Sequence, residues 1–249
     1  MKIAIIELEI IESAPHKNWN NVEKIISKQF DRFANLDFIV LPELFTTGYE
    51  IEKWKDLVSD NFAVLEKSKN LSKNLNSGFI FSILIQEHEE YFNRQFFISP
   101  NGEILQTYDK SHLFRPMKEH ELLTAGGNLT HFSLNKFEVG LAICYDLRFP
   151  EMFLKMSKAG VNLFVIVAEW PHPRCETFMT LAKARAIENY AFVVVANRKG
   201  KDHKNINFCG NSAIIDPFGN VKKIEDNQSF LIDEISLSEV RKARKFIFS

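Results

Sequence analysis

Short apolar runs alternate with longer amphipathic stretches, and this alternation limits how the chain can fold more than any other feature. The runs are rich in β-branched residues and have the length of buried strands; they lie at 3–6, 38–41, 139–144, 161–168 and 192–196. Stretches with apolar residues near i, i+3 and i+4 spacing follow several of them, typical of helices packed on a sheet; they lie at 22–33, 61–75, 150–159 and 174–190. Repeated strand–helix units of this kind predict an α/β protein.

Other strands follow one another without a helix between them. Consecutive strands are predicted at 78–85, 91–99 and 103–108, a hairpin at 211–215 and 221–224, a last strand at 230–235 and a short basic helix at 237–245. Hairpins joined to strand–helix units predict a mixed sheet. No repeat or Pro/Gly-rich linker interrupts the chain, so we expect a single domain over residues 1–249.

The composition is that of an ordinary globular protein, with 45% hydrophobic and 25% charged residues. The formal net charge of -1 favours neither nucleic acid nor an anionic membrane as a partner. Glu7 and Glu9 interrupt the N-terminal apolar run, which is unlike a signal peptide, so we expect a cytoplasmic protein. Three cysteines without a C-x-x-C pair predict neither a disulfide framework nor a zinc site, and we expect no metal or other cofactor.

Cys144 stands where a predicted buried strand passes into polar residues and then into a helix. Ligands of open α/β sheets bind at such carboxyl ends of strands. A helix N-terminus there can lower the pKa of the thiol and supply N–H groups for an oxyanion. A free cysteine is nevertheless often a buried packing residue, and taken alone Cys144 fits that role equally well.

Glu43 and Lys110 occupy comparable positions. Glu43 follows the run 38–41 among Leu, Pro and Phe, which would desolvate its carboxylate, raise its pKa and suit it to proton transfer. Lys110 ends a strand and opens a long loop at 110–128, a length that is often functional. An ammonium group there can stabilise a thiolate or an oxyanion. Each residue by itself is more commonly a solvated side chain at a strand end.

The order Glu, Lys, Cys, each at a strand end, resembles the nitrilase or carbon–nitrogen hydrolase superfamily. The matching blocks are Leu41-Pro42-Glu43, Asp109-Lys110-x-His112-Leu113-Phe114, Cys144-Tyr145-Asp146-Leu147-Arg148-Phe149-Pro150, Ala184-Arg185-Ala186-Ile187-Glu188-Asn189, Ala196-Asn197-Arg198 and Gly210-Asn211-Ser212. The resemblance covers the chain from end to end and implies a four-layer αββα sandwich with mixed sheets.

The resemblance also implies a reaction. Cys144 would attack an amide carbonyl, Glu43 would take its proton, and Lys110 would stabilise the tetrahedral intermediate. Ammonia would leave, and water would release the acid from a thioester. The backbone N–H of Tyr145 would complete the oxyanion site.

The superfamily carries a second glutamate in the loop after the lysine, and the resemblance implies that it positions the lysine and the substrate. Glu119 matches this position better than Glu121, because it stands seven residues before Gly126.

The substrate is predicted less directly. The cysteine block and Glu169-Trp170-Pro171 look most like the ω-amidase branch, which hydrolyses the terminal amide of α-keto acids such as α-ketoglutaramate. Such a substrate carries a carboxylate that needs a cation or N–H donors. Arg148 is the candidate, and an ion pair with Asp146 or Glu188 is its alternative role. Trp170 and Phe114 are candidates for the pocket wall.

One departure weakens the substrate prediction more than the reaction. Branch members often show an aromatic or His-Trp pair at the start of the next helix, whereas Glu176-Thr177-Phe178 stands here, with Phe178 as a possible substitute.

Three alternatives stay open. Another amidase, a nitrilase or an N-carbamoyl hydrolase would use the same three residues. An inactive binding protein on the same fold is disfavoured because all three are retained. A cysteine–histidine pair is a third option, but none of the seven histidines has a flank typical of a catalytic residue, and we expect His112 to be structural. The superfamily also implies a homodimer.

Overall fold

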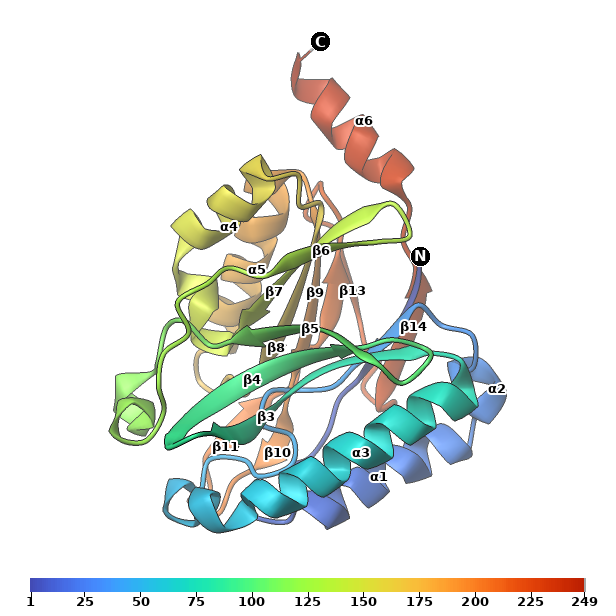
Figure 1. Cartoon of the computed structure of the whole chain (residues 1–249). Helices are drawn as coiled ribbons and strands as arrows, with labels where there is room; N and C mark the ends of the chain where they lie inside the picture. Colours follow the sequence, from blue (N-terminus) through green and yellow to red (C-terminus); the bar gives the residue numbers. More distant parts are fainter. Residues whose placement is uncertain (249) are drawn as a thin grey trace.

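Two six-stranded sheets form the centre of the computed structural model, which describes the backbone of residues 1–248 and the side chains of residues 1–245 (Figure 1). The first sheet contains β1 (Lys2–Ile6), β2 (Phe38–Val40), β3 (Gly78–Glu87), β4 (Glu90–Ile98), β5 (Ile104–Asp109) and β14 (Phe230–Glu234), in the order β14-β1-β2-β3-β4-β5. The second contains β6 (His131–Leu134), β7 (Phe137–Ile143), β8 (Leu163–Ala168), β9 (Phe192–Asn197), β12 (Ala213–Ile215) and β13 (Val221–Lys223), in the order β13-β12-β9-β8-β7-β6. A separate hairpin joins β10 (Lys199–Lys201) to β11 (Asn207–Cys209).

Both sheets are mixed, as the sequence predicts. Strands β1, β2 and β3 are parallel, as are β7, β8 and β9, while each of the remaining strands of the two sheets is antiparallel to the strand or strands beside it. Every residue of β8 and β9 is buried, because a parallel sheet covered on both faces has no solvated side.

The alternation of side chains along each strand separates two apolar layers. On β1, Ile3 and Ile5 face the core between the sheets, whereas Ala4 and Ile6 pack with the residues under the first pair of helices. Burial on both faces explains why the strand sequence is continuously apolar.

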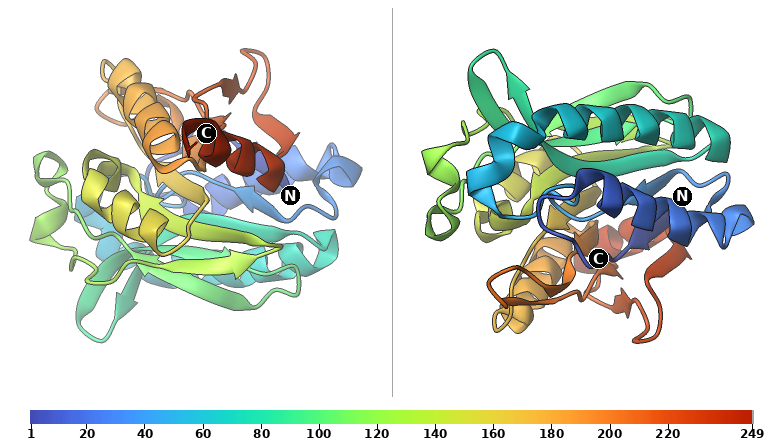
Figure 2. Two further views of the ribbon diagram at one scale, coloured as in Figure 1. Left: turned by 90° about the horizontal axis from the view of Figure 1, so that it is seen from above. Right: turned by 90° about the horizontal axis from the view of Figure 1, so that it is seen from below.

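Helices cover the outer face of each sheet (Figure 2). The helices are α1 (Pro15–Ser27), α2 (Phe30–Phe33), α3 (Val58–Leu75), α4 (Pro150–Lys158), α5 (Cys175–Asn189) and α6 (Leu237–Phe248), with 3-10 turns η1 (Ile51–Leu57), η2 (Arg115–Met117), η3 (Glu119–Glu121) and η4 (Cys144–Arg148). Helices α1 and α3 lie on the first sheet and α4 and α5 on the second, so the expected four-layer αββα sandwich is confirmed. Within the described residues, no helix is long and apolar enough to cross a bilayer.

Two local predictions differ from the structure. The helical pattern at 22–33 covers two helices, because the backbone leaves the helical region at Gln29 (φ -144°); Phe33 on α2 still packs in the same core as Val22. The hairpin β10-β11 was not predicted, since its strands are only three residues long and mostly polar.

Candidate active site

Three predicted catalytic residues meet between the two sheets. Glu43 lies three residues after β2 and Lys110 directly after β5, both from the first sheet, while Cys144 directly follows β7 of the second. Lys110 Nζ lies 2.8 Å from Glu43 Oε1, and the side chains of both residues are fully buried. Cys144 is 9% exposed, so it is almost as well shielded from solvent as Glu43 and Lys110.

Glu119 is the second carboxylate on Lys110, with Oε1 2.6 Å from Nζ. Its other oxygen accepts the backbone N–H of Phe114 at 2.6 Å. Glu121, the alternative alignment, is instead exposed and pairs with Lys118. The geometry therefore favours Glu119 as the residue that holds the lysine.

Tyr49 and Asn93 complete the environment of Glu43 and were not predicted from the sequence. The Tyr49 hydroxyl lies 2.7 Å from Glu43 Oε1 and 2.6 Å from Glu119 Oε1, and Asn93 Nδ2 donates to Glu43 Oε1 at 2.8 Å. A single phenol proton can be donated to only one carboxylate at a time. Tyr49 thus links the two glutamates in one hydrogen-bond network.

The other oxygen of Glu43 accepts the backbone N–H of Glu169 at 2.9 Å. The Glu169 side chain pairs with Arg198 at 2.8 Å, and Arg198 also pairs with Glu12 at 2.6 Å. Arg198 thereby connects the turn after β8 to the segment after β1. This buried ion network holds in place the backbone donor that orients Glu43.

Cys144 is presented on a sharp turn. Its φ of 45° lies in the left-handed region, which is uncommon for a residue with a side chain. Asp146 stabilises this turn because its buried carboxylate accepts the Ile143 N–H at 2.9 Å, the Tyr108 hydroxyl at 2.7 Å and the His112 N–H at 3.0 Å. The result is a strand-to-turn junction that carries the thiol into the site.

His112 has the structural position that we expected. Its Nδ1 lies 2.7 Å from Asp146 Oδ1, and its ring stacks on Phe149 with a centroid distance of 3.6 Å. It belongs to the support of the turn.

The charges of the site depend on one another. Burial by itself would lower the pKa of Lys110, but the carboxylates of Glu119 and Glu43 more than offset this effect and raise that pKa well above its usual value. Burial also raises the pKa of Glu119, against the opposing charge of Lys110. Lys110 therefore stays protonated between two carboxyl groups.

The expectation of a lowered thiol pKa at Cys144 is wrong. Burial raises the pKa of Cys144 well above its ordinary value, and the negative charge of Glu43 adds to that effect, with Lys110 opposing it. Because the thiol is neutral and a carboxylate lies beside it, the arrangement suits removal of the proton during attack.

A pocket with a volume of about 520 Å³, including the part open to solvent, leads from the surface to Cys144. Its wall contains Tyr49, Phe114, Met117, Cys144, Tyr145, Arg148, Glu169, Trp170, Pro171, Arg174, Ile206 and Phe208. All three residues predicted to bind substrate, Phe114, Arg148 and Trp170, are among them. Arg174 and Phe208 were missed, since each lies far along the chain from the residues it faces.

Neither alternative role of Arg148 is realised in the described part of the chain. Asp146 is occupied by Tyr108 and His112, and Glu188 pairs with Arg185 at 2.8 Å. The Arg148 guanidinium instead lies 5.2 Å from the ring centre of Trp170. It is a cation in the pocket wall.

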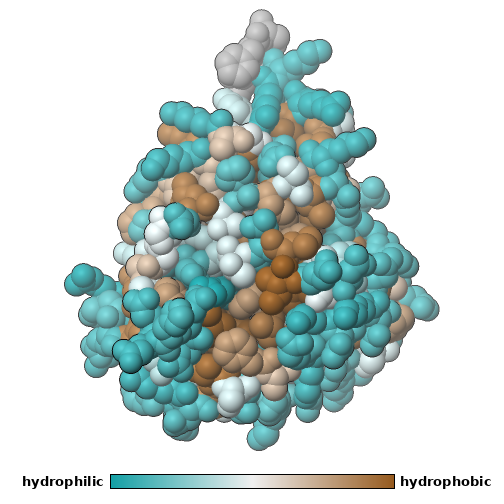
Figure 3. Space-filling model, in the orientation of Figure 1, coloured by the Kyte–Doolittle hydropathy of each residue, from teal (hydrophilic) through white to brown (hydrophobic). Residues whose placement is uncertain are grey.

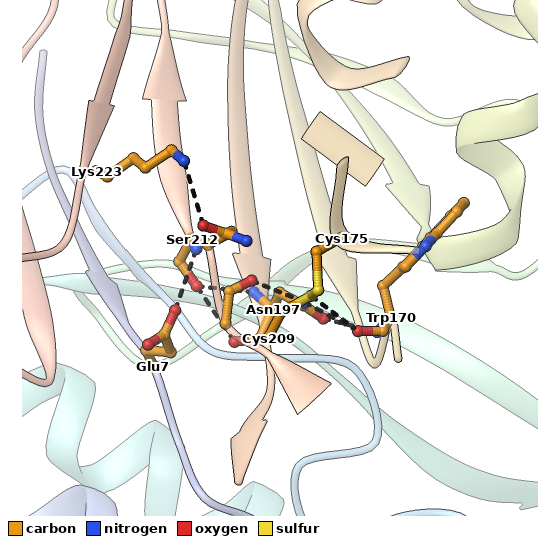
Figure 4. Close-up of a disulfide and its surroundings, with 9 residues drawn as sticks. Glu7, Trp170, Cys175, Asn197, Cys209, Ser212 and Lys223 are labelled. Atoms are coloured by element: carbon orange, nitrogen blue, oxygen red, sulfur yellow. Dashed lines mark hydrogen bonds between the residues drawn. A yellow bond between two sulfur atoms is a disulfide. The ribbon is translucent and has the colours of Figure 1, made fainter. Parts of the chain in front are cut away.

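A disulfide joins Cys175, the first residue of α5, to Cys209, the last residue of β11 (Figure 4). The three cysteines of the sequence predict no disulfide framework, and for Cys175 and Cys209 that prediction is wrong. The preceding residues, Arg174 and Phe208, both line the pocket. The bond thus connects two parts of the pocket wall that are far apart in sequence.

The described residues contain no group of three or more His, Cys, Asp or Glu side chains arranged to hold a metal ion. The chemistry available at and directly behind the pocket wall is that of a thiol, two carboxyl groups, an ammonium and a phenol.

Comparison with known proteins agrees with this geometry. The carbon–nitrogen hydrolase family profile matches residues 2–245. The chain is 33% identical to the 2-oxoglutaramate amidase of Bacillus subtilis over 98% of its length and 94% of the relative's, and 33% identical to the ω-amidase YafV of Escherichia coli over 88% and 84%. A crystal structure of a CN-hydrolase superfamily protein from Xanthomonas campestris superposes with a TM-score of 0.89 at 27% identity, covering 99% of this chain and 94% of that one. The chain belongs to the carbon–nitrogen hydrolase family.

Proposed function

We propose that the protein is a thiol hydrolase of small non-peptide amides and that its substrate is the terminal amide of an α-keto acid, 2-oxoglutaramate or a close analogue. The buried cluster of Glu43, Lys110 and Cys144 carries this proposal, because Cys144 lines a pocket whose wall also contains cationic side chains. The names of the relatives from Bacillus subtilis and Escherichia coli support the substrate class.

The first half of the reaction uses the cluster as follows. Glu43 takes the thiol proton of Cys144 as Sγ forms a bond to the amide carbon, and the carbonyl electrons move onto oxygen. The ammonium of Lys110 and the backbone N–H of Tyr145 stabilise that oxyanion. Collapse breaks the carbon–nitrogen bond, Glu43 returns the proton to nitrogen, and ammonia leaves a thioester.

The second half repeats the proton transfers with water. Glu43 accepts a proton from water as the oxygen attacks the thioester carbon. Collapse then breaks the carbon–sulfur bond, and Cys144 regains its proton as the acid departs. Glu119 and Tyr49 keep Lys110 and Glu43 in position through both halves.

A substrate panel with mass spectrometry tests the proposal. 2-Oxoglutaramate, simple amides, nitriles and N-carbamoyl acids are compared, and a quenched reaction is searched for an acyl adduct on Cys144. We expect preference for 2-oxoglutaramate, an adduct on Cys144 and loss of turnover in Cys144→Ala. Preference for nitriles or carbamoyl compounds would overturn the substrate class. No adduct, together with full turnover by the variant, would overturn the reaction. A failure to hydrolyse any compound would favour the inactive binding protein.

We also propose that the enzyme is a homodimer that pairs through its α4/α5 layer. Leu154 on α4, Ile187 on α5 and the nearby Phe218 are about half exposed, and α6 projects from the body of the molecule (Figure 1). Figure 3, in the orientation of Figure 1, shows apolar side chains near the middle of the visible face with hydrophilic ones around them.

Light scattering tests the dimer. We expect twice the chain mass for the wild type and a monomer for Ile187→Lys. Phe62→Lys, on the opposite helical layer with a similarly exposed side chain, is the control and should remain dimeric. A monomeric wild type contradicts the proposal.

A further inference from the structure

Two guanidinium groups in the pocket wall have no charged partner among the side chains of residues 1–245. Among the described residues, neither Arg148 nor Arg174 forms an ion pair or donates a side-chain hydrogen bond. The acidic side chain of the pocket wall, Glu169, pairs with a buried arginine, and behind the wall Glu43 and Glu119 contact Lys110. The mouth of the pocket therefore carries positive charge that its own acidic groups do not neutralise.

Each guanidinium rests on an aromatic ring from another segment. Arg148 lies over Trp170 at 5.2 Å, and Arg174 lies over Phe114 at 5.8 Å from the ring centre. Contact with a ring face holds a guanidinium while its N–H groups, which lie in its own plane, stay free. Such free edges match the two oxygens of a carboxylate.

Both arginines are tied to the catalytic cluster by short connections. Arg148 follows Cys144 by four residues on the turn η4. Arg174 precedes the disulfide-bonded Cys175, and its aromatic partner Phe114 donates its backbone N–H to Glu119, the partner of the lysine. The position of the two cations relative to the thiol is thus set by covalent and hydrogen-bonded links.

We propose that Arg174 is a specificity-determining residue and that it forms, together with Arg148, a clamp for the carboxylate of the substrate. The clamp selects short amides that carry an anionic group at the end away from the scissile bond, and discriminates against neutral amides of the same length. This inference rests on the proposed function and deepens it, since it names the recognised group and a residue that recognises it.

A matched pair of substrates isolates the carboxylate. Glutaramate carries the terminal amide and a carboxylate, and pentanamide is a neutral amide of the same chain length. Steady-state kinetics with both are measured for the wild type, Arg174→Gln, Arg174→Lys and Arg148→Gln. Arg115→Gln is the control, because Arg115 is exposed in the neighbouring turn η2 and lies outside the pocket wall.

For glutaramate we expect Arg174→Gln to lower kcat/KM by about 10- to 100-fold, through KM, because a charge-assisted bidentate contact is lost. The loss for pentanamide should be far smaller. Arg174→Lys should recover part of the glutaramate activity, since the charge remains and the planar fork does not. Arg115→Gln should match the wild type on both substrates.

Equal losses on both amides would show a structural role and overturn the inference, as would an unchanged KM for glutaramate. Inhibition of pentanamide hydrolysis by glutarate separates this inference from the proposed function. If the wild type rejects all anionic amides, the proposed substrate class is wrong. The inhibition constant of glutarate then remains as the test of the clamp. A weaker glutarate Ki in Arg174→Gln supports the clamp, and an unchanged Ki overturns it.

Discussion

Replacing Lys110 by Met is the perturbation that most directly tests the charge arrangement of the site. Met fills nearly the same space but has no charge, so Glu43 and Glu119 both lose a buried cation that lies 2.8 and 2.6 Å away. Breaking a buried ion pair by removing one partner costs about 3–5 kcal/mol of stability. We expect the free energy of unfolding of Lys110→Met to fall by that amount near neutral pH.

The loss should depend on pH. The folded-state pKa of Glu119 is already raised by burial, and without the ammonium it rises further. A carboxyl group with a raised folded-state pKa contributes stability below its ordinary pKa and loses it as the pH rises through the folded value. The destabilisation of Lys110→Met should therefore be small below the ordinary glutamate pKa of 4.5 and grow toward neutral pH.

Activity should fall as well, because removal of one oxyanion donor costs about 10²- to 10³-fold in kcat. Lys110→Arg keeps the charge but not the compact geometry, so we expect activity lower by orders of magnitude in a folded protein.

Urea unfolding at several pH values and steady-state amide hydrolysis measure both effects. Lys118→Met is the matched control, because Lys118 is exposed and lies 3.7 Å from the exposed Glu121; its cost should stay below about 1 kcal/mol. If Lys110→Met were as stable and as active as Lys118→Met, the buried charge network would not have the role that we assign to it.

Three further predictions concern the neighbouring groups. Tyr49→Phe removes the hydroxyl 2.6 Å from Glu119 and should lower kcat with little change in secondary structure, which kinetics and circular dichroism measure; unaltered kcat would contradict a positioning role. Because burial raises the pKa of Cys144, its alkylation by iodoacetamide should be slower than that of free cysteine and accelerate only in alkaline solution; rapid alkylation in mild acid would indicate a preformed thiolate. Breaking the Cys175–Cys209 bond, whose partners are 34 residues apart, should lower the free energy of unfolding by up to about 3–4 kcal/mol from chain entropy. Urea unfolding of the double Cys→Ser variant checks this, and an unchanged midpoint would contradict it.

The sequence predicted the architecture and the catalytic candidates because both leave local patterns. Strands buried on two faces are continuously apolar, and polar residues at their carboxyl ends appear as an abrupt change from apolar to polar sequence. Glu43, Lys110 and Cys144 all have that signature. The resemblance to the superfamily added the order of the layers, which periodicity alone does not determine.

Local patterns could not identify the partners of these residues. The resemblance favours Glu119 over Glu121 only by its distance from Gly126, and it is the packed loop that brings Glu119 onto the lysine while Glu121 remains in solvent. In the sequence, nothing distinguishes Tyr49 from any other aromatic residue in a turn. Only the folded structure places its hydroxyl between two carboxyl groups. The raised pKa of Cys144 likewise depends on burial that helix position alone does not indicate.

The sequence by itself thus determined the fold class, the family and the position of the reacting thiol on a strand end. The tertiary structure alone decided which charges are paired, that Cys175 meets Cys209, and that Arg148 and Arg174 lie in one pocket without an ionic partner in the described part of the chain. The physical reason is the separation along the chain of the residues that interact. Strand and helix patterns depend on residues close together in sequence, whereas ion pairs, disulfides and pocket walls form between segments that only folding brings together.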